Sequence, residues 1–320
     1  MERIRREARV PAEKAGMRVD RVAAELFADY SRALLSKWIQ EGALRVDDAT
    51  VKPKARLLGG ERLRLDATLE AREDWGTAEP VAFRVVYEDD TLLVIDKPAG
   101  LVVHPGAGNP RGTLVNGLLS YRPGLAHLPR AGIIHRLDKD TSGLLLVAAT
   151  ASAQHVLGKM LGRREVSRRY LALVEGQLVG GMDIDKPLGR DPHRRTRQAV
   201  RDDGRQALTR VRVLARYRAH TLVEATLETG RTHQIRVHLA SAGYPLVGDG
   251  RYGARGRLPP QPDQTTVEVL RAFRRQALHA WKLGLLHPLT GEALSFQAEP
   301  PEDLRRLMEI LEADVHQHDD

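Results

Sequence analysis

The chain of 320 residues contains no cysteine, which excludes disulfide bridges, thiolate metal ligands and a cysteine nucleophile. It also lacks an apolar run approaching the roughly 18 residues that a membrane-spanning helix requires. No apolar stretch follows the charged N-terminus, so a secretory signal is not expected. We therefore expect a cytoplasmic protein.

Aromatic residues are scarce, at 4% of the chain, which argues against a surface built mainly from base-stacking platforms. Basic residues are abundant, and the formal net charge is +8. A basic protein gains affinity for polyanions by releasing phosphate counterions. This composition favours an RNA stem-loop or duplex that is bound through its backbone.

The length predicts about two domains. We expect a small α/β module over residues 17–67, preceded by an N-terminal extension over residues 1–16. A polar, acidic stretch ending in proline predicts a linker over residues 68–80. The remaining divisions are a larger domain over residues 81–312 and a polar tail over residues 313–320.

The small module is predicted from two runs of apolar residues at helical spacing, followed by two short alternating strands near residues 44–46 and 63–65. Ser31 is the predicted N-cap of the second helix, and Gly42 is its predicted C′ residue. The alternative to RNA binding is an ordinary solvated basic face. We favour RNA binding because many cations are predicted to point outward, among them Arg18, Arg21, Arg32, Lys37, Arg45 and Lys52, and Ser31 is a further RNA-binding candidate.

The larger domain is dominated by predicted strands, with few helices between them. This pattern favours an α+β domain around a long mixed, largely antiparallel sheet with flanking helices. The predicted strands are 84–87, 92–96, 144–149, 170–174, 209–214 and 221–227, and the predicted helices are 151–163, 232–242 and 301–313.

The most informative segment is GIIHRLDKDTSGLLLVAA, residues 132–149. A charged block, His135–Asp140, is placed between two apolar runs, which is costly unless the block lines a cleft or its charges pair. An acidic group held there beside Arg136 is therefore a candidate catalytic carboxylate. A surface turn is the alternative, and Asp138 with Asp140 also resembles the carboxylate pair of glycosidases.

The segment TGRTHQIRVHLASAG, which starts at Thr229, predicts a helix between Gly230 and Gly243. His233 and Arg236 are three residues apart, so one helix face can present both. Arg231 would lie at the helix N-terminus, where phosphate binds readily.

Cofactor motifs are missing from the sequence. His233 and His238 point in different directions on a helix, so a metal site is not expected. The glycine-rich stretch that starts at Gly106 has the wrong spacing for a phosphate-binding loop and contains Pro110. We expect neither a metal nor another cofactor.

Several motifs together resemble the pseudouridine synthases of the RluA/RluD type. They are HRLDKDTSGLLLVA from His135, DKPAGLVVHPGAGNP from Asp96, RRYLALVEG from Arg168, TGRTHQIRVH from Thr229 and RQALHA from Arg275. The resemblance covers nearly the whole chain. The N-terminal module is similar to an S4 RNA-binding domain, through Ser31, Arg32, Ile39 and Gly42.

The resemblance implies a pseudouridine synthase fold with a central cleft, and isomerisation of uridine without a cofactor. It implies that Asp138 is the essential carboxylate, that Arg236 is its ionic partner, and that Asp140 is replaceable. Tyr170 would stack on a flipped uracil, and Ile235 would close the pocket. The remaining substrate contacts would come from Arg136, His135, Arg231 and His233.

The resemblance implies that the partner is large-subunit ribosomal RNA and that the protein acts in ribosome biogenesis. We expect no membrane partner. The residues do not decide whether Asp138 acts as nucleophile or base. Transfer RNA remains an alternative target, and a monomer is the favoured oligomeric state. An inactive RNA-binding protein is also consistent with the sequence, as is a carbohydrate or nucleoside hydrolase that uses Asp138 and Asp140. Residues 190–212, rich in arginine, are a candidate lining of the RNA channel, with a solvated loop as the alternative.

Overall fold

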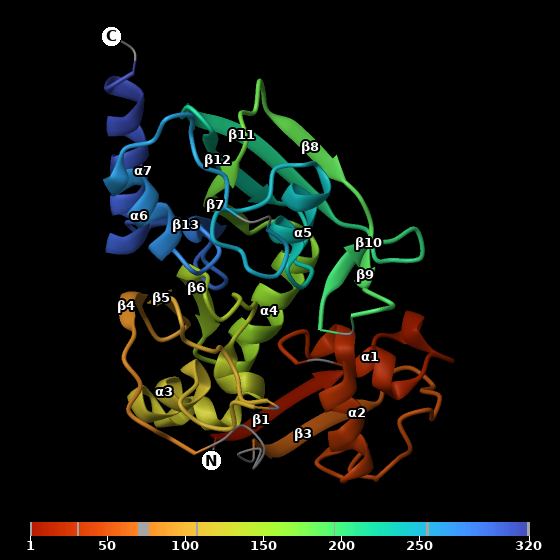
Figure 1. The fold of residues 1–320 in the computed structure, drawn as a ribbon. Coiled ribbons are helices and arrows are strands. Elements are labelled where there is room, and N and C mark those ends of the chain that lie inside the picture. The colour runs from red at the N-terminus through yellow and green to blue at the C-terminus, as the bar shows by residue number, and fades with distance from the viewer. Residues whose placement is uncertain are drawn as a thin grey trace.

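The computed structural model describes residues 2–30, 32–69, 77–106, 108–194, 196–253 and 256–318. Its N-terminal part is a three-stranded antiparallel sheet with two helices, drawn in red and orange in Figure 1. The strand order is β1-β3-β2, and the helices place Val22, Leu35 and Trp38 in the core. Its elements are β1 (Glu2–Arg9), η1 (Ala12–Lys14), α1 (Val19–Leu26), α2 (Arg32–Gln40), β2 (Leu44–Val46) and β3 (Arg62–Leu69).

Both predicted helices and both predicted strands of this module are confirmed. Gly42 follows α2 with a positive φ of 73°, as expected for a C′ residue. The predicted N-cap, Ser31, lies outside the described residues.

The predicted N-terminal extension is wrong. β1 pairs with β3 along its whole length, from Glu2 opposite Leu69 to Arg9 opposite Arg62. Ile4 and Val10 are 6% and 1% exposed and belong to the core of the module. Arginine and glutamate fill most positions of β1 and hide its strand character in the sequence. β3 also reaches Leu69, so the predicted linker begins inside a strand, and residues 70–76 lie outside the described part.

The larger domain is built on one nine-stranded sheet, in the order β4-β5-β6-β13-β7-β12-β11-β8, with β14 paired to β13. β6 and β13 run parallel and the other neighbours run antiparallel, which confirms the predicted mixed, largely antiparallel sheet. The strands are β4 (Arg84–Glu88), β5 (Leu92–Lys97), β6 (Ser142–Ala148), β7 (Ser167–Glu175), β8 (Met182–Asp185), β11 (Leu208–Arg216), β12 (His220–Leu227), β13 (Leu278–Leu286) and β14 (Ala293–Gln297).

Helices and short 3-10 turns flank this sheet (Figure 1). They are α3 (Leu114–Tyr121), η3 (Pro123–His127), η4 (Pro129–Gly132), α4 (Ala151–Gly162), α5 (Gln234–Ser241), α6 (Gln264–Ala272) and α7 (Glu302–His316). The prediction missed α3 and α6. The predicted tail is wrong up to His316, because α7 continues and buries Asp314 against Arg218 at 2.9 Å.

A two-stranded hairpin, β9 (Leu188–Arg190) with β10 (Gln198–Val200), packs against α5 through the contact of Leu188 and Val237. The N-terminal module contacts the larger domain at the start of α4. There Ser152 donates a hydrogen bond to Asp29 at 3.2 Å, and Ala151 packs against the core of the module.

None of the helices in the described part of the chain is long and apolar enough to cross a membrane.

Candidate active site

Asp138 lies in an irregular segment between η4 and β6 rather than on a strand. The amide of Thr141 donates to the Asp138 carbonyl at 3.1 Å and closes a turn. Lys97 is fully buried at the end of β5. It stabilises this turn by donating a hydrogen bond to the carbonyl of Lys139 at 2.9 Å. Its ammonium also donates to the carbonyls of Pro98 and Leu101, each at 2.8 Å. Burial lowers the pKa of Lys97 to about 7, against the opposing attraction of the nearby aspartates.

The turn leads into a close approach between β6 and β13. Gly143 has a φ of 108°, and a Cβ there would lie 2.3 Å from the carbonyl oxygen of Ala280. Only glycine meets both conditions. The Thr141-Ser142-Gly143 sequence therefore holds the end of the Asp138 segment against the sheet.

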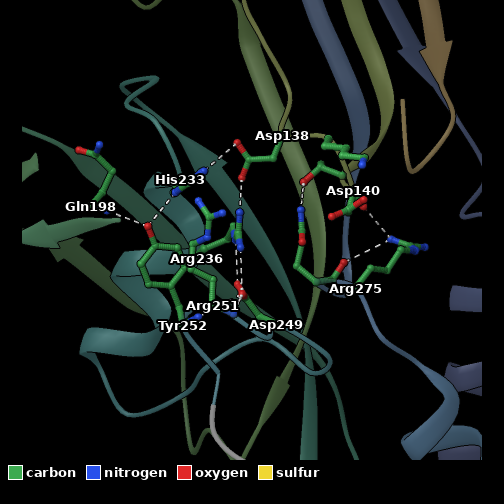
Figure 2. Close-up of polar contacts among 12 residues, drawn as sticks. Asp138, Asp140, Gln198, His233, Arg236, Asp249, Arg251, Tyr252 and Arg275 are labelled. Atoms are coloured by element: carbon green, nitrogen blue, oxygen red, sulfur yellow. Dashed lines mark hydrogen bonds and ion pairs between the residues drawn. The ribbon is translucent and has the colours of Figure 1, made fainter. Parts of the chain in front are cut away.

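The carboxylate of Asp138 faces α5, as Figure 2 shows. Arg236 donates from Nη1 to Oδ2 of Asp138 at 2.8 Å, and Nε2 of His233 lies 3.8 Å from Oδ1. The Asp138 side chain is only 15% exposed. The charge-assisted hydrogen bond to Arg236 therefore operates in a partly desolvated environment, where it is stronger than in water.

Arg236 also binds a second carboxylate. Its Nε and Nη2 donate to Asp249 at 2.7 and 2.9 Å in a bidentate pair. Burial opposes ionisation of both groups, but their mutual hydrogen bonds and attraction dominate, so the pKa of Arg236 is raised and that of Asp249 is lowered. Backbone amides of Arg251 and Tyr252 also donate to Asp249. Asp249 thus orients the guanidinium that contacts Asp138.

Tyr252 links the other groups (Figure 2). Its ring lies 5.0 Å from the Arg236 guanidinium, and its hydroxyl accepts the amide of Gln198 at 2.8 Å and lies 2.7 Å from Nδ1 of His233. Because the hydroxyl oxygen already accepts from Gln198, we assign its hydrogen to Nδ1, which leaves the imidazole proton on Nε2, facing Asp138. Burial lowers the pKa of His233, which favours this neutral imidazole.

Asp138 borders two neighbouring hollows that share several lining residues. The outer cavity, of about 480 Å³, has a strongly basic lining, with five arginines against two acids. The inner recess, of about 50 Å³, is lined by Asp138, Tyr170, Ile235, Arg236 and other residues. Tyr170 on β7 and Ile235 on α5 are both buried, and burial raises the pKa of the tyrosine hydroxyl. The recess thus combines one carboxylate with an aromatic wall and an aliphatic wall.

The structure brings most of the predicted site residues to these hollows. Both hollows are lined by Asp138, Tyr170, Arg136, Arg231 and His233. The outer cavity is also lined by His135, and the recess by Ile235 and Arg236. His135 accepts the amide of Leu146 at 3.2 Å, and burial lowers its pKa to about 3. Arg231 lies before α5, which begins at Gln234, two residues later than predicted, so it is not in the first helical turn.

Asp140 does not share a strand face with Asp138, because both lie outside β6. Arg275 donates to the carbonyl of Asp140 at 3.2 Å, on the side away from His233 and Arg236 (Figure 2). The arrangement does not place the two carboxylates as a matched pair. The ring of His238 is occupied by Thr209 and the Lys186 carbonyl, and it does not approach His233 as a second ligand would.

Several cations on the basic face of the N-terminal module pair with carboxylates, which the sequence did not predict. Arg18 and Arg32 both pair with the buried Asp20, at 2.7 and 2.9 Å. Arg21 lies 3.7 Å from Glu25, and Lys37 lies 3.4 Å from Glu41. Arg45 donates to the Gly42 carbonyl, and Lys52 is exposed.

Three residues with clear roles in this geometry were missed. Asp249 and Tyr252 belong to GDGRYG, a short polar segment that resembles an ordinary turn in the sequence. Gln234, buried at the start of α5, accepts from Thr229 and from the amide of Arg231, which shapes the loop that carries His233.

Comparisons with known proteins identify the family of this chain. The RNA pseudouridylate synthase family model matches residues 91–241. The chain is 52% identical to ribosomal large subunit pseudouridine synthase D of Xanthomonas campestris, over 97% of this chain and 93% of that protein. The protein of the same name from Escherichia coli K12 is 44% identical, with 100% and 98% covered.

Solved structures give a similar result. Human RNA Pseudouridylate Synthase Domain Containing 4 superposes with a TM-score of 0.56 and 26% identity, over 72% of this chain and 93% of that one. Human RNA Pseudouridylate Synthase Domain Containing 1 gives 0.55 and 25%, with 72% and 90% covered. With a carboxylate held by arginine beside a tyrosine-walled recess, and with relatives that span its whole length, this chain belongs to the RNA pseudouridylate synthase family.

Proposed function

We propose that this protein isomerises specific uridines to pseudouridine in large-subunit ribosomal RNA, with Asp138 as the catalytic residue. The observation that carries the proposal is the Asp138 carboxylate, held by Arg236 at 2.8 Å at the mouth of a recess walled by Tyr170 and Ile235. The names of the bacterial relatives supply the ribosomal target. The basic outer cavity suits an RNA backbone.

The reaction breaks the N1–C1′ bond of uridine and forms a C5–C1′ bond, after which C5 loses a proton and N1 gains one. No electrons or groups pass between molecules, so this chain's own residues are sufficient for the chemistry. The base must leave its stack, and Tyr170 and Ile235 offer the aromatic and apolar walls that a displaced base needs. Holding the detached uracil between these walls keeps it close to the ribose until it rejoins.

Asp138 supplies the anion for this chemistry, as nucleophile or as base. Arg236 donates a hydrogen bond to one oxygen of this carboxylate, and Nε2 of His233 lies 3.8 Å from the other, so the carboxylate is held in one orientation. The N-terminal module would add affinity through its exposed cations, among them Lys52 and Arg45, which form no ion pair with a carboxylate of the described residues.

Replacing Asp138 with asparagine is the direct test. Asp138→Asn keeps the shape of the side chain but removes the anion, so we expect loss of isomerisation with RNA affinity nearly unchanged. The measurement is tritium release from a large-subunit rRNA transcript that contains 5-tritiated uridine. Asp140→Asn is the matched control and should stay active. Full activity of Asp138→Asn would contradict the proposal.

The substrate class requires a separate experiment. Carbodiimide-dependent reverse-transcription stops, mapped in cells with and without the gene, should disappear from large-subunit rRNA. If they disappear from transfer RNA alone, the ribosomal target is wrong although the chemistry stands. Release of free uracil with no carbon-linked product would instead favour a hydrolase.

A further inference from the structure

One buried cation in the outer cavity has no assigned role. Arg168 lies on β7 two residues before Tyr170, so both side chains point to the same face of the sheet and into the cavity. Arg168 is 6% exposed. It forms no ion pair with any carboxylate in the ranges that the structure describes. Its Nε has no hydrogen-bond partner, and Nη2 makes one long contact of 3.4 Å with the Leu227 carbonyl.

A buried guanidinium without an anion is costly, since desolvation is not offset by a partner. The neighbouring structure nevertheless leaves room for it. A Cβ at Gly230 would lie 2.8 Å from Nη1 of Arg168, so glycine at this position allows the guanidinium to occupy its place. The charge also acts on the site, since Arg168 lowers the pKa of His135, after the larger effect of burial.

We propose that Arg168 forms a phosphate subsite, which binds a phosphodiester group of the RNA when the target nucleotide enters the cavity. This inference rests on the proposed action on RNA and identifies a contact of the same site. The phosphodiester is the anionic group that RNA offers, and guanidinium binds it in a bidentate, charge-assisted manner. Arg168 lines the outer cavity and not the recess, which places its ligand on the backbone rather than on the base.

The next residue along β7 provides a matched control. Arg169 points to the opposite face of the sheet, where it is half exposed and lies 4.0 Å from Glu224. Arg169→Gln therefore removes the same charge from the same strand without reaching the cavity. Gly230→Ala provides a second variant, because it keeps the Arg168 charge but displaces the end of its flexible side chain.

The test measures the dissociation constant for a protein-free large-subunit rRNA transcript at several salt concentrations, with each change placed in an Asp138→Asn background. Arg168→Gln should raise the dissociation constant by about 10-fold and reduce the salt slope by about 0.7, the value for one phosphate of a single strand. Gly230→Ala should shift in the same direction. Arg168→Lys should keep most of the slope, and Arg169→Gln should match the parent.

Three outcomes would overturn the subsite. Two are an unchanged salt slope for Arg168→Gln and an equal loss in Arg169→Gln. The third is a lower kcat with unchanged affinity when Arg168→Gln is placed in the otherwise unchanged protein, which would indicate a base contact. Thermal melting of each variant checks the fold.

Tritium release by the otherwise unchanged protein tests the proposed function separately. If it isomerises the transcript while Arg168→Gln binds normally, the function stands and the subsite is wrong. If it does not isomerise, the salt slopes still decide the subsite.

Discussion

At the scale of single residues, the site depends on which carboxylates accept the hydrogen bonds of the Arg236 guanidinium. Arg236 donates two hydrogen bonds to Asp249 and one to Asp138. The carboxylate of Asp138 therefore receives a hydrogen bond from a guanidinium that is already fixed in orientation. Asp249 acts through Arg236 and does not approach the recess, which makes it a positioning residue. Its removal should therefore affect both stability and turnover.

We expect Asp249→Asn to lower the free energy of unfolding by about 3 kcal/mol, because it leaves a buried guanidinium without its main anion. The pKa of Asp249 is depressed in the folded protein, so its stabilisation is present above its usual pKa of about 4 and is lost as pH falls below that value. Urea unfolding at pH 7 and near pH 3 should show the difference from the parent shrinking at acid pH. Asp203→Asn, which removes an exposed partner of Arg201, is the control and should change little.

The Tyr252 hydroxyl is the second residue-scale element of the site. Tyr252→Phe keeps the ring against Arg236 but removes the hydrogen bond that sets the tautomer of His233. We expect kcat to fall about 10-fold with a smaller loss of thermal stability, since the hydrogen bonds of the hydroxyl to His233 and to the Gln198 amide are both lost. Single-turnover tritium release at several pH values checks this. An unaltered kcat would contradict the assigned role of the hydroxyl.

At the scale of elements, the Asp138 segment is held by the end of β5. Lys97 donates to three carbonyls, and the amide of Gly100 donates to Lys139 at 3.0 Å, so two distant pieces of chain form one support. The hairpin β9–β10 reaches the same site from the other side, through the Gln198 amide and the carbonyl of Thr196, which accepts from Arg251. The basic hairpin is thus joined to the catalytic groups by hydrogen bonds.

Lys97→Met should loosen this support. The substitution leaves three carbonyls without their shared donor, so we expect the free energy of unfolding to fall by about 2 kcal/mol. Hydrogen exchange at the amide of Gly100 should become faster, and kcat should drop. Lys139→Met is the control, because the Lys139 side chain is exposed and its carbonyl is retained. Equal exchange rates in the two variants would show that Lys97 does not fix the turn.

At the scale of the whole molecule, the first residues of the chain complete the N-terminal module. β1 covers the edge of β3 and contributes Ile4 to the apolar core, and Val10 follows immediately. The module is then joined to α4 by Asp29 and Ser152. Its stability and its position therefore depend on residues that lie far apart in the sequence.

Deletion of residues 1–10 should destabilise the module, because it removes two buried side chains, each worth about 1.5–3 kcal/mol, and exposes a strand edge. We expect a lower melting temperature and weaker binding to the rRNA transcript. Deletion of residues 317–320 is the control, since α7 ends at His316. If the longer deletion melts and binds like the parent, β1 is dispensable.

Much of this protein follows from local patterns in its sequence. A continuous apolar run over residues 144–149 predicts the central strand β6, and the spacing of Leu34, Leu35, Trp38 and Ile39 predicts α2. The charged block between two apolar runs marks its acidic residues as catalytic candidates, because burying a charge is costly, and the family resemblance selects Asp138. The predictions of strands and helices succeed because burial and hydrogen bonding act within a few residues of the chain.

The pairing of distant groups was decided only by the tertiary structure. Asp249 and Tyr252 join Arg236 because the turn that follows Leu246 is packed beside α5, and β1 joins β3 across some 60 residues. Arg168 resembles its neighbour Arg169 in sequence, and only the sheet buries one and exposes the other. A local pattern records what each segment tends to form, whereas long-range packing determines which charges meet and which remain without a partner.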